Sequence, residues 1–146
     1  MTDTTDSLNE IHRAIPHRAP MLLVDEIITR DENTIHCRKT FHEDEFFFQG
    51  HYPDHPLVPG VILCEATVQA GAVLLSGLAG IQNGMPVLTR MNDVKFKNMV
   101  RPGDQIDLHV KLDEVVSNAY YLTGQAKTKG KTAARLSFTC TMAEAT

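Results

Sequence analysis

The sequence predicts an α+β fold in which a curled antiparallel sheet of about six strands wraps round one long central helix. A single apolar segment, about 20 residues long, lies between segments with strand character. A helix that is apolar on nearly all sides needs protein around it, and strands that alternate apolar with polar residues need one covered face. A sheet that curls round the helix satisfies both needs.

The N-terminal part of the chain predicts a short helix followed by a β-hairpin. Asp6-Ser7 followed by Glu10 has the spacing of a capping box, so a helix is expected over about residues 7–15. MLLVDEIITR and NTIHCRKTF, residues 21–30 and 33–41, are rich in apolar and β-branched residues. The polar segment between them predicts the turn of the hairpin.

The apolar segment is predicted to form the central helix over about residues 60–80. Pro59-Gly60 marks its start, and Gly80 or Gly84 is a suitable end. Strand signals then return in four segments, separated by the turn-forming pairs Pro102-Gly103, Ser117-Asn118 and Lys129-Gly130. The order of hairpin, buried helix and four long strands is that of the hot-dog architecture.

The composition fits one globular domain over residues 1–146. Hydrophobic residues make up 42% and charged residues 22%, and the net charge of −4 gives no reason to expect nucleic acid as a partner. Glu65 and Gln69 lie inside the apolar segment, where an acid at membrane depth is costly, so we expect no membrane span. The N-terminus lacks the features of a secretion signal and the three cysteines form no CxxC pair, so we expect a cytoplasmic protein.

Two residues stand out as candidates for chemistry, and each has a structural alternative. Glu65 is a carboxylate in an otherwise apolar helix, which is costly to bury unless it is paired, protonated or facing a cavity. Alternatively, it complements the helix dipole at a surface. His51 and His55 lie in FFFQGHYPDHPLVPG, residues 46–60, where three prolines restrict the backbone. A fixed histidine suits a general base, but either histidine can instead be bonded for structure.

A metal site is not predicted from the same loop. His51, Asp54 and His55 can all ligate a metal, but Pro53 opposes the shared helical face on which an HExxH site depends. We therefore expect no metal ligands in this chain.

The segment GHYPDHPLVPGVILCEATVQAGAVL, residues 50–74, resembles the signature of the FabZ-type 3-hydroxyacyl-acyl-carrier-protein dehydratases of fatty-acid synthesis. IPHRAPMLLVDEI, residues 15–27, and DVKFKNMVRPGDQI, residues 93–106, are similar to further segments of that family and occur in the same order. Related isomerising dehydratases have Asp where this chain has Glu65. Asp54 replaces a common Gly of the family pattern, which puts chain-length preference in doubt more than the reaction.

The resemblance implies dehydration of a (3R)-3-hydroxyacyl thioester on an acyl carrier protein to the trans-2-enoyl thioester. It implies His51 as the catalytic base and Glu65 as the catalytic acid. The backbone N–H of Gly60 at the helix start is placed to stabilise the carbonyl oxygen, and Gln69 to orient Glu65. These groups suffice without any cofactor. The pathway is either bulk fatty-acid synthesis or a specialised one, such as one linked to lipid A.

The resemblance also implies partners. Family members form homodimers that place the two catalytic residues on different subunits, and three dimers often form a hexamer. An acidic carrier is expected to dock on two basic segments, although a solvated strand edge explains either segment alone. The cations of these segments are Lys95, Lys97, Arg101, Lys127, Lys129, Lys131 and Arg135.

Two other functions remain open at this point. A hot-dog thioesterase would use Glu65 to activate water and would give His51 no necessary role. A non-catalytic acyl-chain binding module would bind the thioester and leave it unchanged. Formation of the enoyl product, measured beside release of free thiol, separates the three.

Overall fold

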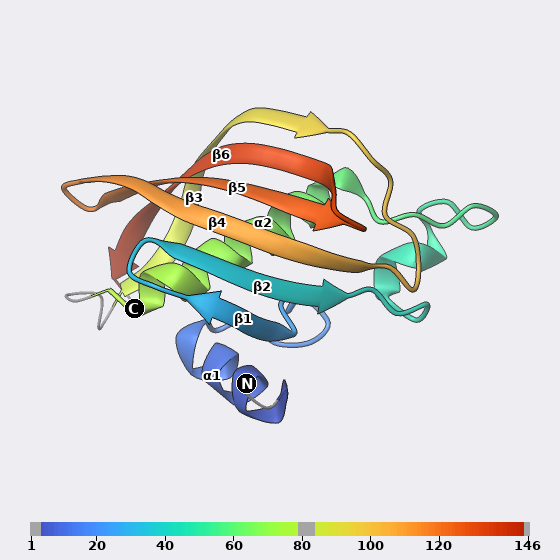
Figure 1. Cartoon of the computed structure of the whole chain (residues 1–146), viewed down its shortest axis with the longest axis horizontal. Coiled ribbons are helices and arrows are strands. Elements are labelled where there is room, and N and C mark those ends of the chain that lie inside the picture. The colour runs from blue at the N-terminus through green and yellow to red at the C-terminus, as the bar shows by residue number, and fades with distance from the viewer. Residues whose placement is uncertain (1–3, 79–83, 145–146) are drawn as a thin grey trace.

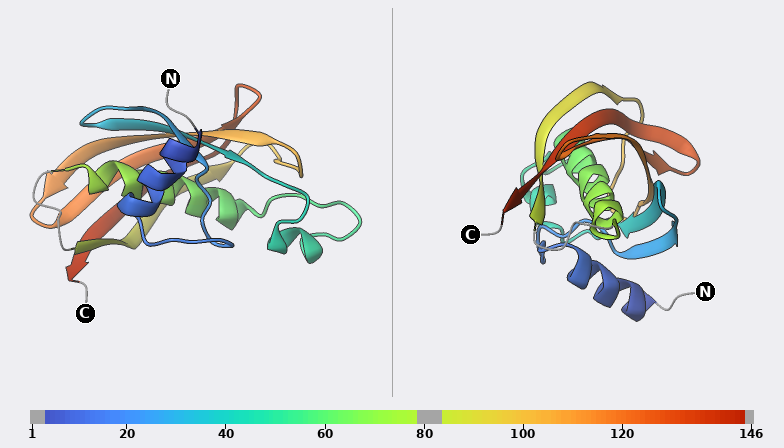
Figure 2. Two further views of the ribbon diagram at one scale, coloured as in Figure 1. Left: turned by 90° about the horizontal axis from the view of Figure 1, so that it is seen from below. Right: turned by 90° about the vertical axis from the view of Figure 1, so that its left-hand side faces the viewer.

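In the computed structural model, which describes residues 4–78 and 84–144, a six-stranded antiparallel sheet curls round the long helix α2, Gly60–Ser76 (Figure 1). Seen end-on, the sheet forms an arc with α2 inside it (Figure 2). The strands lie side by side in the order β1-β2-β4-β5-β6-β3, so β1 and β3 are the edges. Their bounds are β1 Glu26–Arg30, β2 Thr34–Thr40, β3 Gly84–Phe96, β4 Gln105–Val116, β5 Ala119–Thr128 and β6 Lys131–Glu144. The predicted hot-dog fold class is confirmed.

The hydrophobic core fills the space between the concave face of the sheet and α2. On β4, Ile106, Leu108 and Val110 are buried and alternate with residues that are partly exposed or exposed. Along α2, nearly every side chain from Leu63 to Leu75 is buried. The sheet surrounds the helix, so the helix can be apolar on most of its sides. No helix within the described residues is long and apolar enough to cross a membrane.

The N-terminal helix α1, Thr4–Ala14, begins earlier than the capping box at Asp6-Ser7 predicts. Ser7 is not a cap, because it lies inside the helix with its side chain buried. Its hydroxyl lies 3.4 Å from both the N–H and the carbonyl oxygen of Ile27 on β1. The polar residue that looked like a start signal therefore joins the helix to the edge of the sheet.

Helix α2 ends at Ser76, four residues before the predicted end near residue 80. Gly77, and not Gly80 or Gly84, follows the last turn; Gly80 lies outside the described residues and Gly84 begins β3. Arg30 donates to the carbonyl oxygens of Val73 at 2.6 Å and Leu74 at 3.5 Å. A Cβ on Gly77 would collide with this guanidinium, so a larger residue here would displace the arginine side chain that caps the helix.

Strand β1 is shorter than predicted, because residues 21–25 are not part of it. Their backbone groups bond elsewhere: the N–H of Leu23 and the carbonyl of Met21 both bond to the side chain of Gln69. The side chain of Gln69 therefore takes the place that a neighbouring strand would have as hydrogen-bond partner of this segment.

The loop between β2 and α2 projects from one end of the molecule (Figure 1). It contains a short 3₁₀ helix, Phe46–Gln49. Phe47 and Phe48 are buried and Phe47 packs edge-on against Phe41, with ring centroids 5.9 Å apart. Phe46 is exposed. Two of the three consecutive phenylalanines thus hold the loop to the core.

Candidate active site

Glu65 lies in the second turn of α2 and is the one acidic residue of that helix. Its neighbours Cys64 and Ala66 are buried, but its own side chain remains 32% exposed. The carboxylate therefore sits on an apolar helix at a point where another molecule can reach it. A group in that position can exchange a proton with a bound ligand.

Gln69 holds the carboxylate of Glu65 from one turn further along the helix. Its Nε2 donates to Glu65 Oε2 at 2.9 Å and to the carbonyl of Met21 at 2.8 Å, and its Oε1 accepts from the N–H of Leu23 at 2.8 Å. The side chain is 1% exposed. Both N–H donors of this buried amide and its oxygen are therefore engaged, so its orientation is set by the fold.

His51 lies in the loop that the prolines restrict, and main-chain bonds close that loop around it. The N–H of Leu57 donates to the carbonyl of His51 at 3.2 Å, and the N–H of His51 donates to Phe47 at 3.1 Å. The imidazole is half-buried and lies against the ring of Tyr52, with centroids 4.4 Å apart. The N–H of Val58 then ties the loop to Val100 at 2.7 Å.

The bond made by the His51 ring identifies which nitrogen is free. Nδ1 lies 3.1 Å from the carbonyl oxygen of Leu57. A carbonyl oxygen can only accept, so Nδ1 carries the proton of the neutral ring. The Nε2 lone pair is then left to take a proton from another molecule, which is the state that a general base requires.

His55 differs from His51 in its surroundings. Its side chain is exposed, and its ring makes no hydrogen bond within the part of the chain that the structure describes. Only its backbone N–H contributes to the loop, by donating to Tyr52 at 3.0 Å. The ring of His51 is therefore held in place by a hydrogen bond, and the ring of His55 is not.

Gly60 begins α2, and no side chain caps the helix there. Its N–H makes no hydrogen bond within the described residues, so it remains available as a donor. The ring of Phe96 packs directly against it, and a Cβ at this position would lie 2.8 Å from that ring. A larger residue at the helix start would have to displace this exposed aromatic side chain.

A mostly apolar pocket of about 470 Å³ opens beside this helix start. It lies between the first turn of α2 and the segment after β3, and its lining includes Gly60, Leu63, Phe96 and Met99. An apolar pocket next to free backbone donors can take an apolar chain that ends in a polar carbonyl.

Within one chain, the side chains of His51 and Glu65 make their contacts with different residues. No hydrogen bond or ion pair joins them among the described residues; the partners of Glu65 are Gln69 and His17, and the ring of His51 bonds to Leu57. On one subunit, each of the two side chains is therefore oriented by its own hydrogen bond.

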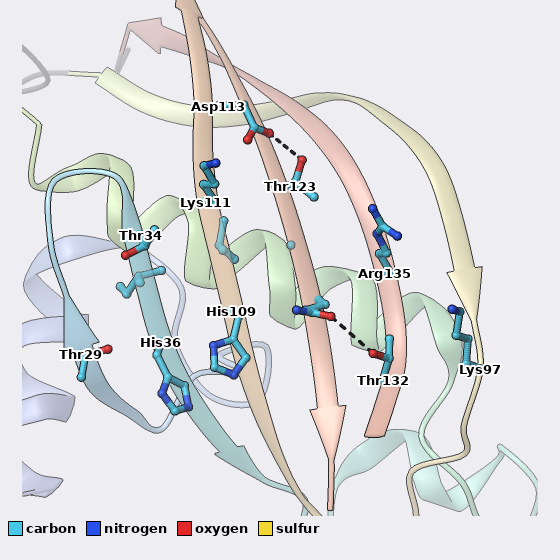
Figure 3. A pocket seen from close by; sticks show the side chains of 14 residues that line it. Thr29, Thr34, His36, Lys97, His109, Lys111, Asp113, Thr123, Thr132 and Arg135 are labelled. Atoms are coloured by element: carbon cyan, nitrogen blue, oxygen red, sulfur yellow. Dashed lines mark hydrogen bonds between the residues drawn. The ribbon is translucent and has the colours of Figure 1, made fainter. Parts of the chain in front are cut away.

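A second hollow, of about 750 Å³, lies on the face of the sheet that is turned away from α2 (Figure 3). Side chains of β2, β4, β5 and β6 point into it, among them the stacked rings of His36 and His109 with centroids 4.2 Å apart. Burial and the neighbouring charges of His36 and Lys127 lower the pKa of His109. Lys97, Lys111 and Arg135 also line this outer groove.

The seven predicted docking cations lie on the surface but not in one place. Lys97 and Arg135 line the outer groove, and Lys127 lies close enough to influence His109. Lys129 lies 3.8 Å from Asp104, so part of its charge is balanced. The remaining three, Lys95, Arg101 and Lys131, are exposed.

Sequence reasoning missed one residue of the site. His17 Nε2 lies 3.9 Å from Glu65 Oε2, although 48 positions separate the two residues. The signal was present in IPHRAPMLLVDEI, which matched the family pattern as a whole without pointing to any one residue. Only the fold shows that this segment crosses the helix at Glu65.

Three comparisons place these features among known proteins. The family model described as ApeI dehydratase matches residues 27–137. A curated 3-hydroxyacyl-[acyl-carrier-protein] dehydratase FabZ of Lactococcus lactis is 38% identical over 135 residues, which cover 92% of this chain and 94% of that protein. The FabZ of Oenococcus oeni is 41% identical over 110 residues, covering 75% of this chain and 79% of that protein.

Solved structures agree on the fold. The ApeI:P dehydratase heterocomplex of Xenorhabdus doucetiae contains a chain that matches with a TM-score of 0.79 at 19% identity, covering 92% of this chain and 91% of that one. A hypothetical thioesterase of Streptococcus pneumoniae, solved with coenzyme A, matches with a TM-score of 0.64 at 10% identity, covering 97% and 98%. At these identities the likeness concerns the architecture alone.

Proposed function

The chain belongs to the 3-hydroxyacyl-[acyl-carrier-protein] dehydratases, and we propose that His51 and Glu65 perform its reaction. The protein is a hydro-lyase that removes water from a 3-hydroxyacyl thioester in fatty-acid biosynthesis. The observation that carries the assignment of residues is that two side chains are each held ready for proton transfer. His51 presents a free ring nitrogen, and Glu65 presents an oriented carboxyl group.

The reaction begins at C2 of the (3R)-3-hydroxyacyl thioester. His51 Nε2 takes the C2 proton, which the neighbouring thioester carbonyl makes acidic. The electron pair of the C–H bond moves toward the carbonyl oxygen, where negative charge grows. The free N–H of Gly60, at the positive end of α2, donates to that oxygen and stabilises the charge.

Glu65 completes the reaction at C3. Its carboxyl group gives a proton to the hydroxyl as the C3–O bond breaks, so that water leaves and the trans-2 double bond forms. Gln69 keeps the carboxyl turned toward the substrate through its bond to Oε2. The proton taken by His51 and the proton given by Glu65 balance, and the scheme uses no metal or organic cofactor.

The complete site is proposed to form between two copies of the chain. Within residues 4–78 and 84–144, β3 pairs only with β6, so its outer edge has unpaired backbone groups that a second β3 could bond. Large apolar side chains are exposed along and just beyond this strand, namely Met85, Val87, Leu88, Met91, Phe96 and Met99. Such a surface is typical of a homodimer interface. In this arrangement, His51 of one subunit would act together with Glu65 of the other.

Co-expression of His51→Ala and Glu65→Gln chains tests this arrangement. If each site uses His51 from one subunit and Glu65 from the other, a mixed dimer has one intact site and one doubly altered site. Random pairing then restores about a quarter of the wild-type sites. If both residues act from the same subunit, the co-expressed chains stay as inactive as either variant alone. The mass in solution shows whether three dimers join.

The acidic carrier is proposed to dock at the outer groove and the cations around it. Lys97 lines both the outer groove and the apolar pocket beside Gly60, so the two are neighbours. Lys97, Lys111 and Arg135 form no ion pair with any described residue, which leaves their charges free for an anionic partner. A thioester arm can then reach the helix start from the docked carrier.

Charge reversal tests the docking surface. Lys97→Glu and Arg135→Glu are expected to raise KM several-fold for a carrier-bound substrate and to leave KM for a small thioester unchanged. Arg13→Glu, on the exposed side of α1, is the control. Equal effects on both substrates would place these residues in the substrate site and not in docking.

The reaction itself is tested by incubating the protein with 3-hydroxybutyryl and 3-hydroxymyristoyl thioesters. Enoyl absorbance is expected to rise without release of free thiol. Thiol release without enoyl formation would make the protein a thioesterase, and unchanged substrate would make it a binding module. Comparing the two substrates also reports the chain-length preference.

A further inference from the structure

His17 is the one titratable side chain close to Glu65 that the scheme above leaves without a role. It lies in the loop after α1, and its Nε2 is 3.9 Å from Glu65 Oε2. This is the same oxygen that Gln69 binds at 2.9 Å. Two nitrogens therefore face one carboxylate oxygen, and Oε1 accepts no hydrogen bond from any described residue.

The backbone that carries His17 is held firmly. The guanidinium of Arg18 donates to the carbonyls of Ile15 at 2.9 Å, His17 at 2.7 Å and His12 at 2.9 Å. A few residues further on, Gln69 binds the backbone at Met21. The loop is thus bonded on both sides of His17, and its approach to Glu65 follows from the fold.

The second nitrogen of His17 indicates which tautomer is present. Nδ1 is buried and has no hydrogen-bond partner within the described chain. A proton on Nδ1 would be a buried donor without an acceptor, and the Nε2 lone pair would then face the carboxylate oxygen. With the proton on Nε2 instead, the ring points a donor at Glu65 Oε2. The second arrangement still leaves Nδ1 as a buried acceptor without a donor, but it removes the repulsion between the Nε2 lone pair and the carboxylate.

We propose that His17 is a positioning residue for Glu65. His17 and Gln69 together engage Oε2 of Glu65, which leaves Oε1 to carry the proton given to the substrate hydroxyl. This inference rests on the proposed function. A distance of 3.9 Å is longer than a hydrogen bond, but such contacts often shorten when substrate closes an active site. His17 acts on the carboxyl group and does not touch the substrate.

The test uses full-length variants and a small 3-hydroxyacyl thioester. His17→Ala is expected to lower kcat roughly ten- to a hundredfold with KM unchanged, because the carboxyl group loses one of its two guides. His17→Gln places an amide N–H near the position of Nε2 and is expected to restore most of kcat. His12→Ala, in the same N-terminal segment and without contact to Glu65, is the control and is expected to match the wild type.

A second measurement separates positioning from a general structural effect. In a Glu65→Gln background, His17→Ala is expected to cause no further loss, because the group through which His17 acts is already changed. A further loss there, a failure of Gln to restore kcat, or unchanged kcat in His17→Ala would each overturn the inference. Wild-type protein that forms no enoyl product would instead overturn the proposed function itself.

Discussion

Glu65 and His51 are held by different kinds of contact. Glu65 stands on a buried helix, and a side chain, Gln69, orients its carboxylate. His51 stands in a loop, and a backbone carbonyl, that of Leu57, orients its ring. One substitution, at Gln69, can therefore remove the hydrogen bond that orients Glu65. The bond from His51 to a backbone carbonyl cannot be removed by a substitution and can only be weakened by making the loop more flexible.

This difference separates the effects expected from substitutions around the two residues. Gln69 also satisfies the backbone at Met21 and Leu23, so it serves the fold as well as the site. The prolines around His51 limit the conformations of a short loop and bond to nothing through their rings. Three experiments test the contrast, from the largest expected effect to the smallest.

Substituting the reacting groups themselves is expected to have the largest effect. His51→Ala and Glu65→Gln should each lower kcat by about 10²- to 10⁴-fold on a 3-hydroxyacyl thioester, because each removes a proton-transfer group. Circular dichroism and thermal unfolding should show a folded protein, since both side chains are partly exposed. Near wild-type turnover in both variants would disprove the assignment of the two residues.

Removing the support of Glu65 is expected to affect both activity and stability. Gln69→Leu leaves the buried Leu23 N–H without a partner and removes the part-buried bond to the Met21 carbonyl, which should lower the free energy of unfolding by about 1 to 3 kcal/mol. The freed carboxyl group should lower kcat by about tenfold or more. Urea unfolding and steady-state kinetics measure the two effects. Gln105→Leu, an exposed residue at the start of β4, is the matched control.

Loosening the support of His51 is expected to have the smallest effect. Pro56→Ala gives the unfolded chain and the loop more freedom while the Leu57 carbonyl remains, so stability should fall by only about 0.4 to 1 kcal/mol. The value of kcat should fall no more than a few-fold. Pro102→Ala, in the turn before β4, serves as the control. If Pro56→Ala lowered kcat as much as Gln69→Leu does, His51 would depend on its loop as strongly as Glu65 depends on Gln69.

The sequence predicted the elements better than it predicted their ends. Hydrophobic periodicity and turn pairs located the strands and α2, because these signals are local. The start of α1 and the end of α2 were misplaced, because the contacts that decide them come from other elements. Arg30 of β1 caps α2 at Gly77, and Ser7 bonds to β1 instead of starting α1.

The candidate site shows the same division. Glu65 and His51 are conspicuous in the sequence, one as an acid in an apolar helix and the other as a histidine between prolines. Their hydrogen bonds could not be read there, apart from the one-turn spacing of Glu65 and Gln69. The bond from His51 to Leu57 depends on the path of the loop, and the approach of His17 depends on the packing of the N-terminal segment on α2.

Hydrophobic periodicity and turn pairs therefore predicted the hot-dog fold, and the resemblance of three segments to FabZ-type dehydratases predicted the family and made His51 and Glu65 the candidates for its chemistry. The folded chain adds the bond of the His51 ring to Leu57, the carboxylate oxygen of Glu65 that Gln69 binds, and the approach of His17 to that same oxygen. The reason is physical: periodicity and motif order are properties of neighbouring residues. The direction of a hydrogen bond between distant segments exists only once those segments have packed together.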